Sequence, residues 1–93
     1  MNFEWDETKR IVNLEKHKVD FPAATLIFQN QFASRPYSRR DYGEARKIAL
    51  GQSGDLVLVV VYVERGNTIR VISARKAGRH ERNYLSEILT QRN

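Results

Sequence analysis

The chain has 93 residues, no cysteine, two histidines and a formal net charge of +5. This length predicts one domain over residues 1–93 with a modest core. The lack of cysteine excludes disulfides and cysteine-rich zinc sites, and two histidines do not favour a conventional metal site. No apolar run approaches the roughly 20 residues that span a bilayer. The acidic start lacks the apolar stretch of a signal peptide, so we expect a soluble, cytoplasmic protein with no membrane partner.

The positive charge is concentrated in two stretches of the chain. Residues 35–47 contain five Lys or Arg against two acids, and residues 70–82 contain five against one. This distribution is typical of proteins that bind a polyanion, which here could be RNA, DNA or an acidic protein. The alternative interpretation is a basic surface with no particular partner.

The N-terminal region predicts a short edge strand over residues 3–5 and then a helix. Asp6 is a good N-cap, and the helix should end near His17. Its apolar side is predicted to be Ile11, Val12 and Leu14. Residues three or four apart share a helix face, so the other side should carry four polar residues: Lys9, Asn13, Lys16 and His17.

Asp20 is predicted to cap a second helix, with Pro22 at an early helical position. Residues 32–37 then predict an edge strand, because Pro36 cannot donate to a strand ladder. Residues 38–44 read as a polar loop, and residues 46–51 as another strand.

The strongest pattern is a hairpin over residues 56–76, turning at Gly66 and Asn67. Residues 56–63 are apolar at every position, which predicts a central strand buried on both faces. A two-residue turn would place Val63 opposite Arg70 and Leu58 opposite Arg75. Arg65 and Arg70 would then share one face of the sheet, and Arg75 would lie on the other with Ser73 and Tyr62.

A closing helix is predicted over residues 79–91, with an apolar stripe of Tyr84, Leu85, Ile88 and Leu89. The expected fold class is α+β. It consists of a four-stranded antiparallel meander, a possible short N-terminal strand, two N-terminal helices and one C-terminal helix. We expect the helices to cover one face of the sheet.

Arginines inside an apolar strand need a partner or a solvent-filled groove, because burying an unpaired charge is costly. One interpretation pairs them with Glu44, Glu64 or Glu81. The other is a phosphate site, since the guanidinium fork matches phosphate geometry. Five aromatic side chains could stack on bases, although two of them, Trp5 and Tyr84, are more typical of a core: Trp5, Tyr37, Tyr42, Tyr62 and Tyr84.

Several motifs together resemble BrnT-type toxins. Near the N-terminus these are Phe3-Glu4-Trp5-Asp6, Lys9, Asn13, Lys16-His17 and Val19-x-Phe21. In the hairpin they are residues 62–66 and 69–77. The match extends through Ala24, Phe28, the strand ending at Gly51, and Glu81, Arg82 and Tyr84. The chain departs from the family pattern twice. Lys18 stands where glycine is usual, and Ala45 takes the place of the second carboxylate in a common Glu-Glu-Arg.

The resemblance implies a RelE-like α+β fold and a ribonuclease that uses neither a metal nor a cofactor. It also implies the toxin of a type II toxin–antitoxin system. Its partners would be an RNA substrate and a ribbon-helix-helix antitoxin, with operator DNA bound only through the antitoxin complex. Competing functions are a non-catalytic nucleic-acid-binding module and a protein that only docks the antitoxin.

RNA cleavage without a metal needs a base for the 2′-OH, cations for the phosphorane and an acid for the leaving oxygen. Our hypothesis assigns charge stabilisation to Arg65, Arg70 and Arg75. Lys16 and His17 are candidates for proton transfer or phosphate contact, and Glu44 for a base or a partner that orients an arginine. Further RNA contacts are expected from four cationic residues: Lys9, Arg46, Lys76 and Arg79.

Overall fold

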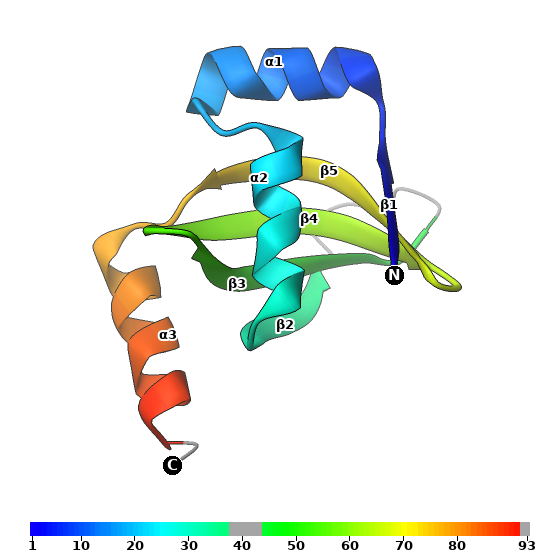
Figure 1. The fold of residues 1–93 in the computed structure, drawn as a ribbon. Helices are drawn as coiled ribbons and strands as arrows, with labels where there is room; N and C mark the ends of the chain where they lie inside the picture. The colour runs from blue at the N-terminus through cyan, green and yellow to red at the C-terminus, as the bar shows by residue number, and fades with distance from the viewer. Residues whose placement is uncertain (38–43, 92–93) are drawn as a thin grey trace.

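The structure is a computed structural model that describes residues 1–37 and 44–91 (Figure 1). The order of elements follows the sequence prediction. It is β1 (Asn2–Trp5), α1 (Glu7–His17), α2 (Phe21–Thr25), the 3₁₀ helix η1 (Leu26–Gln29), β2 (Phe32–Tyr37), β3 (Arg46–Ser53), β4 (Leu56–Arg65), β5 (Thr68–Lys76) and α3 (Arg79–Gln91). Of the predicted loop over residues 38–44, the structure describes Glu44. The remaining residues of that loop, including Tyr42, lie outside the described residues.

The strands form one sheet in the order β1-β5-β4-β3-β2. Strands β2 to β5 pair antiparallel with their neighbours, which confirms the predicted meander and the α+β class. The N-terminal strand is a fifth member, and it pairs parallel with β5. The predicted two-residue turn at Gly66 and Asn67 is confirmed, because Arg65 pairs with Thr68. Gly66 has a φ of 59°, a left-handed value that suits glycine.

Helices α2 and η1 cover one face of the sheet, with α2 crossing in front of the strands in Figure 1, and α1 lies along the edge formed by β5. The core lies between these layers. Its largest fully buried side chains are Phe21, Ile27, Leu58, Val60, Tyr62 and Val71. Gly51 lets η1 approach β3 closely, since a Cβ there would lie 2.8 Å from the Cβ of Ile27. We refer to this side of the sheet as the covered face and to the opposite side as the open face.

A β-bulge in β5 decides which side chains reach the open face. Tyr62 pairs with Val71, but Val61 pairs with Ser73, so Ile72 is an extra residue in β5. Beyond it every side chain changes face relative to a regular ladder. The predicted pair Leu58–Arg75 was therefore wrong, because Leu58 pairs with Lys76. Arg75 lies opposite Val59, and Arg65, Arg70 and Arg75 all share the open face.

The orientation predicted for α1 was also wrong. The residues expected to form its buried side are exposed, with Ile11 at 47%, Val12 at 55% and Leu14 at 37%. The buried residue is Asn13, at 6% exposure, because its side-chain amide bonds to backbone groups of the sheet. The side of α1 that carries Lys9, Lys16 and His17 therefore borders β5.

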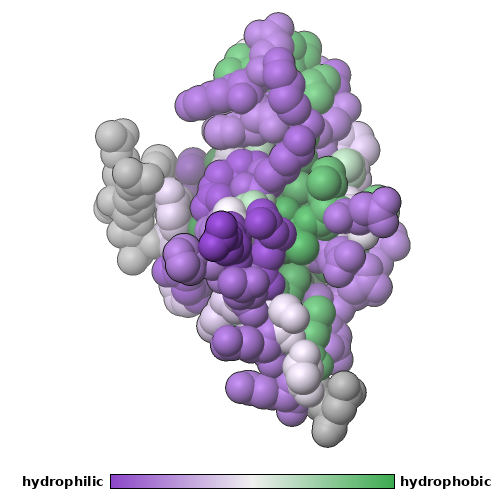
Figure 2. All heavy atoms as spheres, turned by 90° about the vertical axis from the view of Figure 1, so that its left-hand side faces the viewer, coloured by the Kyte–Doolittle hydropathy of each residue, from purple (hydrophilic) through white to green (hydrophobic). Residues whose placement is uncertain are grey.

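Helix α3 does not join the other helices on the covered face, contrary to expectation. It contacts β2 and β3 and stands at one end of the open face (Figure 1). Leu85 is buried, whereas Tyr84, expected in the core, is 57% exposed. Figure 2 shows a hydrophobic stripe on the side of the molecule that carries α3, bordered by polar surface.

The two predicted helix N-caps are confirmed. Asp6 accepts a hydrogen bond from the Lys9 amide at 3.0 Å, and Asp20 accepts one from the Phe21 amide at 2.9 Å. Helix α1 ends at His17, and its C-cap is Lys18, whose φ of 61° and ψ of 28° are left-handed. A left-handed C-cap normally selects glycine, which explains physically why glycine is usual at this position of the resembled pattern.

Replacing Lys18 with glycine should stabilise the protein by about 1 kcal/mol, because glycine has no Cβ to strain the left-handed backbone. For a domain of this size, we expect the melting temperature to rise by about 4–8 °C. Thermal unfolding followed by circular dichroism measures this. Lys18→Ala is the matched control, since it removes the same side chain but keeps Cβ. An equal gain in both variants would contradict the backbone explanation.

Candidate functional site

The open face carries a group of arginines paired with carboxylates at its hairpin end. Arg65 donates from Nη2 and Nε to the two carboxylate oxygens of Glu44, at 2.7 and 3.2 Å. Arg70 donates to Glu4 at 2.7 Å, and Arg65 Nη1 also reaches Glu4 at 3.4 Å. Glu4 is on the open face because β1 pairs parallel with β5 and sets it beside Arg70. These four residues form the hairpin-end cluster.

A second pair lies at the α3 end of the same face. Arg75 donates from Nη1 and Nη2 to the two carboxylate oxygens of Glu81, at 2.9 and 2.8 Å. Glu81 also accepts the Gly78 amide at 2.8 Å, so it caps α3 and holds the arginine with one carboxylate. The hydrogen bonds from Arg75 are the main reason that the pKa of Glu81 falls to about 2. This pair therefore stays ionised at any physiological pH.

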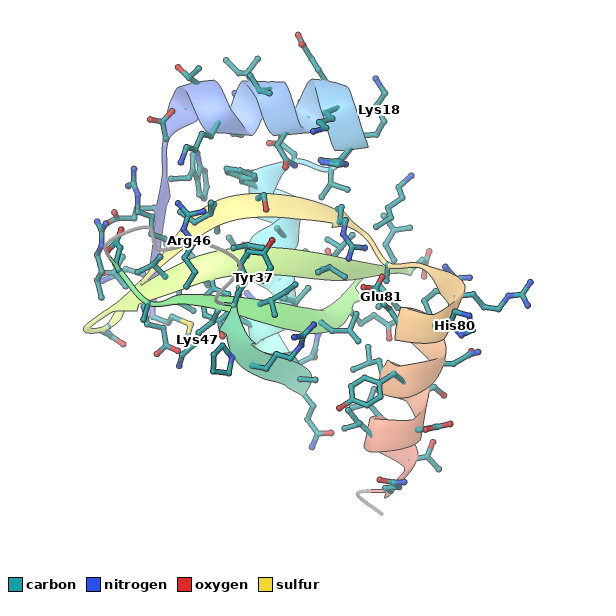
Figure 3. The ribbon with its side chains drawn as sticks, turned by 180° about the vertical axis from the view of Figure 1, so that it is seen from behind. Lys18, Tyr37, Arg46, Lys47, His80 and Glu81 are labelled. Carbon is teal, nitrogen blue, oxygen red and sulfur yellow. The ribbon has the colours of Figure 1, made fainter. Side chains whose placement is uncertain are left out.

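Strands β2 and β3 add polar side chains between the two ends. Figure 3 shows Tyr37 and Arg46 over the open face and Glu81 at the start of α3. Tyr37 is close enough to Arg75, and Arg35 to Glu81, for each to influence the partner's pKa. Arg46 and Arg70 help Arg65 to lower the pKa of Glu44, the bond from Arg65 being the largest cause. Charged side chains from all five strands thus lie on the open face.

A cavity of about 320 Å³ lies where the open face meets α3. Its floor is apolar and includes Ile48, Leu50 and Val59. Arg35, His80 and Tyr84 stand at its sides. This cavity was not foreseen from the sequence, since α3 was expected on the covered face.

A separate groove of about 290 Å³ runs between α1 and the bulged part of β5. It is lined by Lys9, Lys16 and His17 from the helix and by Ile72 and Ser73 from the strand. The structure therefore brings these three predicted cationic residues together. Ser73 lies on the open face, so the groove lies next to the arginines that β5 carries on that face.

The structure brings most of the candidate residues to one side of the molecule, but not all. Five of them lie on the open face: Glu44, Arg46, Arg65, Arg70 and Arg75. Lys76 lies opposite the core residue Leu58 and so belongs to the other face, and Arg79 is exposed at the start of α3. Sequence reasoning had foreseen Glu44 and Glu81 as arginine partners. Glu64 instead pairs with Lys47 at 2.7 Å.

The sequence analysis did not include Glu4 or Arg35 among the candidate site residues, and it described the exposed Tyr84 as more typical of a core. The signal for Glu4 would have been a parallel pairing of β1 with β5, which no local pattern reveals. Within residues 1–37 and 44–91 there is no cluster of three or more histidine and acidic side chains that could hold a metal ion. No helix in these residues is long and apolar enough to cross a membrane.

Residues 5–81 match the sequence profile of a family described as "Ribonuclease toxin, BrnT, of type II toxin-antitoxin system". The chain belongs to the BrnT family. No curated protein gives a significant match. BrnT membership agrees with the resemblance noted in the sequence, and the α+β architecture is compatible with a RelE-like toxin fold. The matched range contains the Arg75–Glu81 pair, the α1 groove and the hairpin-end cluster except for Glu4.

Proposed function

We propose that this BrnT protein is a metal-independent endoribonuclease that cleaves RNA on the open face and thereby inhibits translation. A ribbon-helix-helix antitoxin neutralises it, and the toxin–antitoxin complex binds its own operator DNA. The observation that carries the proposal is the bulge at Ile72, which places Arg75 on the same face as Arg65 and Arg70, the face that α1 and α2 leave uncovered. A concentration of arginines on a rigid sheet suits a polyanion whose phosphates must be held while one of them reacts.

The reaction follows from the chemistry of RNA. The 2′-oxygen attacks the adjacent phosphorus and the bond from phosphorus to the 5′-oxygen breaks, which leaves a 2′,3′-cyclic phosphate and a free 5′-hydroxyl. Negative charge grows on the non-bridging oxygens in the transition state, where guanidinium groups stabilise it. Arg70 and Arg75 are proposed for this role because both project from the bulged strand onto the open face.

The proton transfers are assigned to groups at the border of this face. Glu44 is proposed to accept the 2′-hydroxyl proton or to orient Arg65, because its carboxylate is held at the edge of the open face by two hydrogen bonds from Arg65. Lys16 and His17 face the neighbouring groove, where they would contact a phosphate or protonate the leaving oxygen. Lys9 and Arg46 are proposed to hold the RNA backbone on either side.

The test uses purified protein, a single-stranded RNA and excess EDTA. We expect cleavage with 2′,3′-cyclic phosphate ends, and no cleavage of the same sequence with 2′-O-methyl groups, which cannot supply the nucleophile. Intact RNA in EDTA with cleavage restored by a divalent metal would refute metal independence. Salt-dependent binding without cleavage under any condition would instead support the non-catalytic alternative. In cells, expression should degrade RNA and arrest growth, and co-expression of a ribbon-helix-helix antitoxin should relieve both.

A further inference from the structure

The cavity between α3 and the open face has the features of a site for a flat aromatic ligand beside an anion. Its volume is about 320 Å³, and its floor is formed by aliphatic side chains of three strands, among them Ile48, Leu50 and Val59. Tyr84 projects from α3 at its side and is 57% exposed. A large aromatic side chain left this exposed beside an apolar hollow is the arrangement that stacks on nucleic-acid bases.

The surroundings of the cavity show which ligand would enter it. Arg35 lines the cavity and His80 stands beside it, and both offer N–H groups to the edge of a ring. Arg75 lies next to it through its pair with Glu81, which also lines the cavity. A nucleotide site needs two parts. One is an arginine for the phosphate, and the other is an apolar cavity with an aromatic wall for the attached ring. The carboxylate of Glu81 is already occupied by Arg75 and the Gly78 amide, so it does not repel the incoming phosphate as a free anion would.

We propose that this cavity is a nucleobase pocket, in which one unpaired base of the RNA stacks on Tyr84 while its phosphate lies at Arg75. The pocket rests on the proposed function, because it names how the same RNA is gripped. It adds Tyr84 to the residues that are assigned above to the RNA. It also gives α3 a role beyond covering the end of the sheet.

Binding can be measured separately from cleavage with a fluorescent RNA oligonucleotide that carries 2′-O-methyl groups throughout. A second probe has the same backbone but abasic residues. We expect the wild-type protein to bind the base-containing probe roughly 10- to 100-fold more tightly than the abasic probe, as stacking energies imply. Tyr84→Ala should lose this discrimination, and Tyr84→Phe should keep it. The tyrosine is exposed, so its truncation leaves the core intact.

Asn83→Ala is the matched control, because Asn83 is exposed on the same helix and does not line the cavity. It should bind both probes like the wild-type protein. The proposal is overturned if Tyr84→Ala still discriminates between the probes, or if it weakens binding to both equally. Unchanged RNA binding together with lost neutralisation by an antitoxin would assign the cavity to a protein partner and would also overturn it. Discrimination by a protein that never cuts unmodified RNA would count against the proposed function alone.

Discussion

Replacing Arg70 or Arg75 with alanine should lower the rate of RNA cleavage by about 10²–10³-fold, the usual effect of removing one group that stabilises transition-state charge. Arg70 lies on the open face by the regular register from the hairpin turn, and the bulge at Ile72 brings Arg75 to the same face. Cleavage kinetics on a defined RNA in EDTA measure the effect. The double variant should be inactive but folded, since each arginine sits in a partly exposed ion pair worth about 0–1 kcal/mol.

The control must remove a positive charge without touching the open face. Lys47→Ala does so, because Lys47 pairs across the ladder with the core residue Tyr62 and bonds to Glu64. Its activity should stay close to that of the wild-type protein. Arg70→Lys and Arg75→Lys keep the charge but lose the planar fork, so they separate charge from bidentate geometry. A double alanine variant that still cleaves RNA at the wild-type rate would remove both residues from the mechanism.

The features that sequence alone predicted are those encoded by neighbouring residues. Asp6 and Asp20 as N-caps, the turn at Gly66 and Asn67, and Pro36 in an edge strand each express a local preference, and each is confirmed. The same holds for the order of strands in the meander, because short connections force consecutive strands to pair.

The errors in predicting the faces and partners of the arginines arose from features that are not encoded by neighbouring residues. A bulge adds a single residue to β5, and no alternation of apolar and polar residues distinguishes Ile72 as the extra one. The result was an incorrect division of Arg65, Arg70 and Arg75 between two faces. The parallel pairing that brings Glu4 to Arg70 spans 66 positions, so it could not be read from a local pattern.

Helix α1 shows why hydrophobic periodicity failed there. Its sheet-facing side is polar because β1 pairs with β5 only as far as Val71, which leaves the edge of β5 beyond that residue without a strand partner. The side chain of Asn13 fills this role. It donates to the Ala74 carbonyl at 2.8 Å and to the Val19 carbonyl at 2.9 Å, and it accepts from the Ala74 amide at 3.1 Å. One buried amide thus joins α1 to the strand that carries Arg75.

Replacing Asn13 with alanine should therefore destabilise the fold by about 3 kcal/mol, because the buried amide and carbonyl of Ala74 and the Val19 carbonyl lose their bonds to Asn13. For a domain of this size, this corresponds to a fall in melting temperature of more than about 10 °C. Urea or thermal unfolding measures the loss. Alanine is the better helix former, so the intrinsic preference of α1 acts in the opposite direction and cannot explain a decrease.

Val12→Ala provides the comparison within the same helix, since Val12 is 55% exposed and should change stability very little. Asn13→Asp tests the direction of the bonds. It keeps an acceptor for the Ala74 amide but replaces both donors with a buried negative charge facing two carbonyl oxygens, so it should be at least as damaging as alanine. If Asn13→Ala were no less stable than Val12→Ala, Asn13 would not be what joins α1 to β5. The exposure of Ile11, Val12 and Leu14 would then lack its present explanation.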